Sequence, residues 1–89
     1  MEICAKITGR VQGVGFRVTV RQAAIRLGIV GTVKNLEDGS VEIHAFGDKE
    51  VIQEMLTSLK KINTFISISD IDSKEIIPQK NYQDFKIIY

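Results

Sequence analysis

The sequence predicts one α+β domain spanning residues 1–89, in which two helices cover one face of a single antiparallel sheet. Three observations predict this fold. A length of 89 residues suits one domain with a single thin core. Two segments place apolar residues at helical spacing, and the segments around them alternate apolar with polar residues, as half-buried strands do. Hydrophobic residues make up 44% and charged residues 26%, which are ordinary values for a globular protein.

The first half of the chain predicts a strand, a helix and a second strand. The first strand is indicated by alternating apolar residues, namely Ile3, Ala5 and Ile7. The helix is indicated by four apolar residues that share one helical face: Val20, Ala23, Ala24 and Leu27. Gly28 follows, and glycine in the left-handed conformation is a common helix end. Residues 29–35 then predict the second strand.

The second half predicts two further strands around a second helix, and a short final strand. Asp38-Gly39 indicates a tight hairpin turn before a third strand over residues 40–46. Asp48 is a candidate N-cap. The helix after it is indicated by an apolar stripe of Val51, Ile52, Met55, Leu56 and Leu59. The rest of the chain predicts a strand, a loop and a short strand over residues 65–77, 78–84 and 85–89.

This order, βαββαβ with one extra short C-terminal strand, is that of the ferredoxin-like sandwich. Both strand–helix–strand connections are expected to be right-handed. The fold hosts many unrelated activities, so the function has to be argued from particular residues.

Charge is distributed unevenly, although the net charge is only +1. Residues 1–36 hold six cationic side chains against one carboxylate, a net charge of +5, and residues 37–89 carry a net charge of −4. This asymmetry favours a local anion site over a general polyanion-binding surface. The sequence contains no signal-like or membrane-spanning apolar segment, and Cys4 is its one cysteine. We therefore expect a cytoplasmic protein with no disulfide and no membrane partner.

The segment Gly9–Arg17, GRVQGVGFR, holds three glycines and two arginines between the first predicted strand and the first helix. Glycines let successive amide N–H groups turn inward around an anion, and a helix N-terminus adds unpaired N–H groups. The guanidinium of Arg17 can hold two phosphate oxygens at once. The Walker loop does not fit, because Phe16 and Arg17 follow Gly15, and the dinucleotide fingerprint fails at Val18. On spacing alone, a tight turn with incidental arginines stays open.

Three segments together resemble the acylphosphatase family: GRVQGVGFR, AAIRLGIVGTVKNLEDGSVEIHAFG from Ala23 to Gly47, and the final DFKIIY. The resemblance covers nearly the whole chain. It implies a hydrolase that cleaves the carboxyl–phosphate bond of a small acyl phosphate to a carboxylate and inorganic phosphate, by in-line attack of water. It also implies that the reaction needs no metal, no cofactor and no covalent phosphoenzyme.

The resemblance also implies roles for particular residues. Arg17, the arginine of the Gly-Phe-Arg segment, binds the phosphate, and Asn35, the asparagine of the Val-x-Asn segment, positions the attacking water. Inorganic phosphate or sulfate is expected to bind in the same place. The backbone amides that surround the phosphate oxygens belong to Gln12, Gly13, Val14, Gly15 and Phe16.

Three positions depart from the family pattern. Thr32 and Val18 stand where an aromatic residue is frequent, and Leu36 stands where several members carry a hydroxyl residue. These changes could alter the preferred acyl group or the rate, and they leave the implied chemistry intact.

Two other functions stay open at this point. A module that binds phosphate or acyl phosphate would keep the loop and lack turnover. An RNA-recognition module would share the fold, but it needs stacking aromatic residues on its central strands, so we expect no nucleic-acid partner. His44 is predicted to be an ordinary sheet-surface residue. The chain has one cysteine and one histidine, which are too few for a zinc site to be predicted. The few exposed apolar runs favour a monomer.

Overall fold

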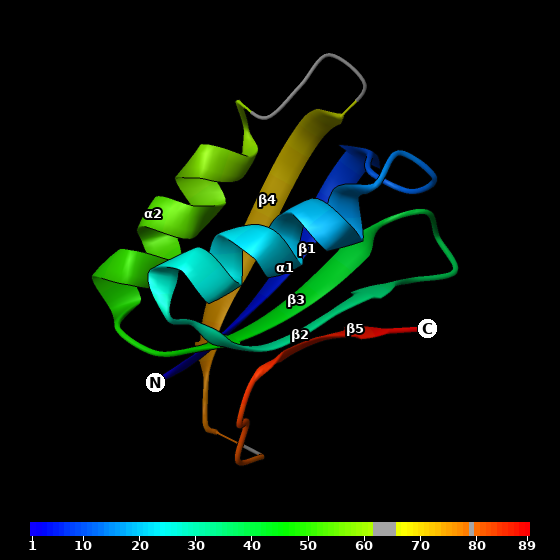
Figure 1. Ribbon diagram of the computed structural model, residues 1–89. Helices are drawn as coiled ribbons and strands as arrows, with labels where there is room; N and C mark the ends of the chain where they lie inside the picture. Colours follow the sequence, from blue (N-terminus) through cyan, green and yellow to red (C-terminus); the bar gives the residue numbers. More distant parts are fainter. Residues whose placement is uncertain (62–65, 79) are drawn as a thin grey trace.

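The computed structural model describes residues 1–61, 66–78 and 80–89. Its strands and helices follow the predicted order (Figure 1). They are β1 (Glu2–Arg10), α1 (Phe16–Leu27), β2 (Val30–Asn35), β3 (Val41–Phe46), α2 (Lys49–Leu59), β4 (Ser67–Ile76) and β5 (Phe85–Ile88). The predicted ferredoxin-like α+β class is confirmed. Residue 65, where the fourth strand was expected to begin, lies outside the described residues. Neither helix is long and apolar enough to cross a membrane within the described part of the chain.

The five strands form one sheet in the order β4-β1-β3-β2-β5. Four of them pair antiparallel, as predicted, but β5 lies parallel to β2, so the sheet is mixed. The cause is the path of the chain. Because β4 is antiparallel to β1, Ile76 pairs with Glu2, so β4 ends where β1 begins. Phe85 pairs with Gly31 at that same end of the sheet, and β5 therefore runs in the direction of β2.

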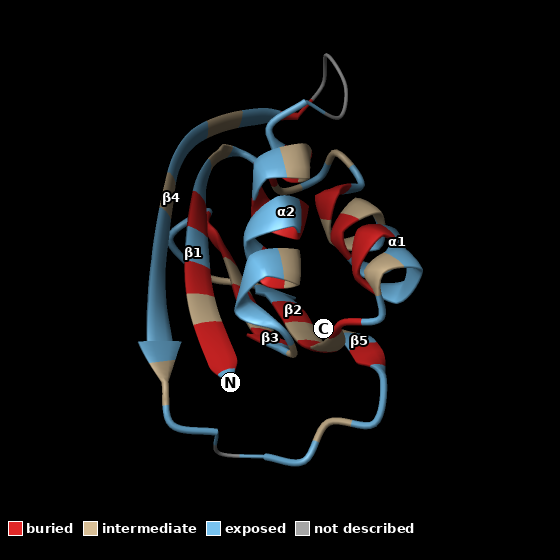
Figure 2. Ribbon diagram, turned by 90° about the vertical axis from the view of Figure 1, so that its left-hand side faces the viewer, coloured by how far each residue is buried: buried red, intermediate tan, exposed pale blue. Residues whose placement is uncertain are grey.

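Both helices cover one face of the sheet, and the core lies between these two layers (Figure 2). Alternation along β1 and β3 places every second residue in this core: Ile3, Ala5, Ile7, Val41, Ile43 and Ala45. The helices contribute the apolar residues of their inner faces, among them Phe16, Val20, Ala24, Ile52, Met55 and Leu59. Burying one such side chain stabilises the fold by about 1.5–3 kcal/mol, so the core fixes the positions of the loops at its ends.

The end of α1 and the start of α2 are set by local sequence signals, as predicted. Gly28 ends α1 in the left-handed conformation, with φ of 72°, and its amide donates to helix carbonyl oxygens. The Asp48 carboxylate accepts a hydrogen bond from the Glu50 amide and caps the N-terminus of α2.

Candidate active site

The C-terminal ends of three strands and the N-terminus of α1 lie together at one end of the sheet. Val41 pairs with both Ile7 of β1 and Asn35 of β2, and Lys34 pairs with Ile88 of β5. The C-terminal ends of β1, β2 and β5 therefore lie together. The connection from β1 to α1 starts at this edge, so the topology places the glycine loop beside Asn35 and the C-terminus (Figure 1).

A backbone irregularity bends the end of β1 into the loop. The register of β1 against β4 shifts between Thr8 and Gly9, where Gly9 has φ of 136°. A Cβ on Gly9 would lie 2.1 Å from the carbonyl oxygen of Ser67, so only glycine allows the two strands to approach this closely.

Buried side chains anchor the loop at both ends. Val11 and Phe16 are each 1% exposed, and between them Gly13 and Gly15 are exposed. Both glycines adopt the left-handed conformation, with φ of 75° and 77°. Left-handed residues within a turn are a hallmark of backbone anion nests. Gly13 and Gly15 thus adopt backbone angles that other residues avoid, and their role around an anion stays a prediction.

The N-terminus of α1 has free hydrogen-bond donors. Gly15 is the N-cap, no side chain caps this end, and the first turn carries no acidic residue. The first intrahelical bond runs from the Thr19 amide to the Gly15 carbonyl, at 3.1 Å. The amides of Phe16, Arg17 and Val18 therefore have no intrahelical partner, and the positive end of the helix dipole adds to them. This arrangement suits a bound anion.

Arg17 extends from this first turn toward the C-terminus of the chain. Its Nη1 donates a long hydrogen bond of 3.5 Å to the Ile88 carbonyl, and its guanidinium carbon lies 4.9 Å from the centre of the Tyr89 ring. No carboxylate among the described residues forms an ion pair with it. The guanidinium is therefore oriented by weak contacts while its charge stays available to an anion. Sequence reasoning missed Tyr89, because only the parallel pairing of β5 brings it here.

A hollow of about 90 Å³ lies against this helix end. Four of the predicted site residues line it: Gly13, Gly15, Phe16 and Arg17. Three others do not. The side chain of Val14 packs on the core, and those of Gln12 and Asn35 lie outside the lining. The other residues that line it are Val11, Val18, Ile87 and Tyr89, so Arg17 is its one cationic side chain and most of the others are apolar or aromatic.

Gln12 holds the loop to the β2–β3 connection. Its side-chain Nε2 donates to the carbonyl oxygens of Leu36 and Ser40, each at 2.8 Å. Both protons of this amide are thus used within the protein, so its side chain positions the loop, and only its backbone N–H is available to an anion. Because Leu36 follows Asn35, the same bonds fix Asn35 relative to the loop.

Asn35 carries an unused acceptor. Its Oδ1 is buried, and no donor among the described residues reaches it. An unsatisfied buried acceptor costs about 1–3 kcal/mol, and such groups in native structures have a reason. The role predicted for Asn35, to hold a water molecule, would give this oxygen a donor, and it stays a prediction.

The fold and this site define a small α+β protein with a hollow at a helix N-terminus whose free amides and arginine suit an anion. Comparison with known proteins identifies it further. The acylphosphatase family model matches residues 3–87. An acylphosphatase of Clostridium acetobutylicum is 43% identical over 84 residues, which cover 94% of this chain and 92% of that protein. The chain belongs to the acylphosphatase family, and the predictions of a hydrolase and of an acylphosphatase enzyme are confirmed.

Solved structures agree with this assignment. The crystal structure of acylphosphatase from Bacillus subtilis superposes with a TM-score of 0.91 at 35% identity, covering 99% of this chain and 98% of that chain. HypF from T. kodakarensis contains a similar region, with a TM-score of 0.89 and 34% identity over 100% of this chain, which is 12% of the HypF chain. The fold therefore occurs both as a short chain and within a much larger protein.

Proposed function

We propose that this acylphosphatase hydrolyses small acyl phosphates with Arg17 as the phosphate-binding side chain and Asn35 as the residue that positions water. The observation that carries this proposal is the juxtaposition at one sheet edge of a cationic hollow and a buried acceptor, Asn35 Oδ1, that lacks a donor among the described residues. The phosphoryl oxygens are held by the guanidinium and by the backbone amides of residues 12–16.

The reaction needs no acid group from the protein. An acyl phosphate releases a carboxylate whose conjugate acid has a pKa of about 4, so the leaving group departs without protonation. Phosphoryl transfer has a loose transition state, in which positioning and electrostatic stabilisation dominate. The amides and Arg17 supply the electrostatic part, since both face the developing charge on the phosphoryl oxygens.

The nucleophile is a water molecule that Asn35 orients. The Oδ1 acceptor fixes one O–H of the water, which leaves a lone pair directed at phosphorus in line with the carboxylate oxygen. Asn35 does not act as a base near neutral pH, so the proton of the water passes to a phosphoryl oxygen. The bond to the new oxygen forms as the bond to the carboxylate breaks, and no metal or covalent phosphoenzyme takes part.

We further propose that residues 1–89 act as one monomeric cytoplasmic domain that binds no nucleic acid. On the open face of the sheet, β1 presents Cys4 and Lys6, and Phe46 of β3 is the one aromatic side chain that these two central strands place there, so they offer no stacking pair. The lone cysteine, Cys4, is free.

The test is phosphate release from benzoyl phosphate and acetyl phosphate, compared with binding of inorganic phosphate to the same sample. Turnover that persists after treatment with a chelator supports the proposal. Phosphate binding without turnover would show a binding module, and turnover that a chelator abolishes would overturn the metal-free mechanism.

A further inference from the structure

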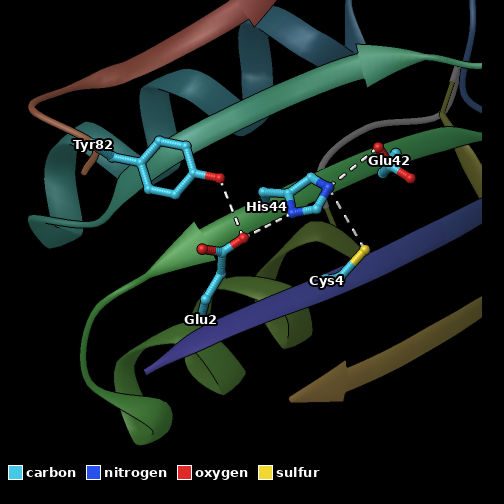
Figure 3. A network of polar contacts seen from close by, with 5 residues as sticks. All are labelled: Glu2, Cys4, Glu42, His44 and Tyr82. Carbon is cyan, nitrogen blue, oxygen red and sulfur yellow. Dashed lines mark hydrogen bonds and ion pairs between the residues drawn. The ribbon is translucent and has the colours of Figure 1, made fainter. Parts of the chain in front are cut away.

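A second polar cluster lies on the face of the sheet opposite the helices (Figure 3). Cys4 of β1 and His44 of β3 are cross-strand partners, and Glu42 precedes His44 by two residues on the same face. Cys4 Sγ lies 3.8 Å from His44 Nε2, which lies 3.2 Å from Glu42 Oε1. One ligand atom from each of the three residues lies within 4.8 Å of the other two. Counting cysteine and histidine in the sequence could not reveal this group, because its third member is a carboxylate.

Glu2 holds the imidazole ring of His44 in place. The Glu2 side chain is 1% exposed, and its Oε2 lies 2.9 Å from His44 Nδ1. The same oxygen accepts a hydrogen bond of 3.2 Å from the Tyr82 hydroxyl. Metal-binding histidines commonly donate their second ring nitrogen to a carboxylate in this way, which fixes the tautomer and makes the free nitrogen a better ligand.

The contact between His44 and Glu42 requires a proton or a metal ion between the two groups. With its proton on Nδ1, facing Glu2, a neutral imidazole directs the lone pair of Nε2 at a carboxylate oxygen. Two acceptors at 3.2 Å repel each other unless a proton or a metal ion lies between them. A proton shared between His44 and a carboxylate, as in an imidazolium bridge, satisfies this geometry, and so does a metal ion that Cys4 also binds.

We propose that Cys4 Sγ, His44 Nε2 and the Glu42 carboxylate bind one divalent ion of the zinc class, with Glu2 as the residue that positions His44. A tetrahedral zinc site places sulfur and nitrogen ligands about 3.6 Å apart, and nitrogen and oxygen ligands about 3.3 Å apart, by its standard bond lengths. The distances in the structure, 3.8 Å and 3.2 Å, differ from these by a few tenths of an ångström. For the third pair, Cys4 Sγ and the ligand oxygen of Glu42, the separation is at most 4.8 Å.

The donor set decides the class of ion. Thiolate, imidazole and carboxylate together suit Zn²⁺ and Co²⁺, whereas Mg²⁺ and Ca²⁺ require oxygen ligands alone. A hollow of about 250 Å³ borders His44 and Glu42 and has room for water as the fourth ligand. Lys34 and Lys80 also line it, and they offset the negative charge of Glu2 and Glu42.

This site is separate from the catalytic one. None of its ligands lines the hollow beside Arg17, and they lie on the opposite face of the sheet from the helices. The proposal is therefore independent of the roles assigned to Arg17 and Asn35. A bound ion would connect β1 to β3, so its effect is expected on thermal stability and not on turnover.

Cobalt provides a direct probe, because Cys4 is the one cysteine of the chain. Reduced, metal-free protein is titrated with Co²⁺ and then with Zn²⁺. We expect a thiolate-to-cobalt charge-transfer band that saturates at one equivalent and that Zn²⁺ removes. X-ray absorption of the zinc form should show one sulfur at about 2.3 Å and lighter ligands at about 2.0–2.2 Å.

Variants separate a metal site from an imidazolium bridge. Cys4→Ser should abolish the band, His44→Gln and Glu42→Gln should lower the affinity at least tenfold, and Glu2→Gln should lower it by about 10- to 100-fold. The matched control, Glu54→Gln on the exposed face of α2, should leave it unchanged. Circular dichroism verifies that each variant is folded. A wild-type protein without the band, or a folded His44→Gln variant with wild-type affinity, would overturn the proposal.

Discussion

Replacing Arg17 with lysine tests the proposed phosphate grip. Lysine keeps the positive charge but not the planar fork, so one of two hydrogen bonds to the phosphoryl oxygens is lost. A hydrogen bond to a charged group is worth about 1.5–3 kcal/mol. This loss corresponds to a decrease of roughly 10- to 150-fold in kcat/KM. The contact of Arg17 with the Tyr89 ring, 4.9 Å away, exists in the free protein and so adds nothing to this figure.

The assay is steady-state hydrolysis of benzoyl phosphate. Arg17 is half-buried, and its only side-chain hydrogen bond among the described residues is long, so the melting temperature should change little and the loss of rate should not reflect unfolding. Arg26→Lys, in the exposed last turn of the same helix, is the matched control and should keep the wild-type rate. A kcat/KM for Arg17→Lys within a few-fold of wild type would refute the proposal that the guanidinium holds two phosphoryl oxygens.

Three further predictions concern Asn35, Gly31 and Asp38. Asn35→Ala should lower kcat about 100-fold, as expected for a misplaced nucleophile, while phosphate still inhibits with near wild-type affinity; an equal loss of phosphate affinity would make Asn35 a phosphate ligand. Gly31→Ala should lower the free energy of unfolding by at least about 2 kcal/mol in denaturant titrations, because the new Cβ would lie 1.8 Å from a carbonyl oxygen of β3 at φ of 147°. Hydrogen bonds from Lys6 and then from Ser40 hold the pKa of Asp38 well below its reference value of 3.8. Asp38 therefore stabilises the fold above that pH and loses its effect as the pH falls through its folded pKa. Asp38→Asn should be less stable than wild type at pH 7, and the difference in free energy of unfolding should narrow below pH 3.8. A difference that stays constant down to pH 2 would contradict this.

Local features of the fold were predictable from the sequence because their causes are local. The left-handed end of α1 at Gly28 and the cap of α2 at Asp48 depend on residues within one turn. The alternation of β1 and β3 likewise follows from which residues are apolar. The direction of β5 was not predictable, because it depends on the edge of the sheet to which the chain returns after β4.

The chemistry of the candidate site was predictable from the sequence, but the contacts that hold its residues in place were not. GRVQGVGFR indicates an anion loop because glycine, arginine and a helix start occur together in sequence. Gln12 looked like one more loop residue, but its side chain bonds to carbonyl groups more than twenty residues away. Tyr89 over Arg17 and Glu2 behind His44 are contacts across 72 and 42 positions, respectively, which only the strand register brings together.

The central claim is that the glycine loop and Arg17 together enclose a phosphoryl group beside Asn35. A crystal structure of the protein with inorganic phosphate tests it most directly. We predict phosphate in the hollow beside α1, with its oxygens on the amides of residues 12–16 and on the Arg17 guanidinium, and a water molecule on Asn35 Oδ1. Phosphate bound elsewhere, with these amides facing away from it, would contradict the account.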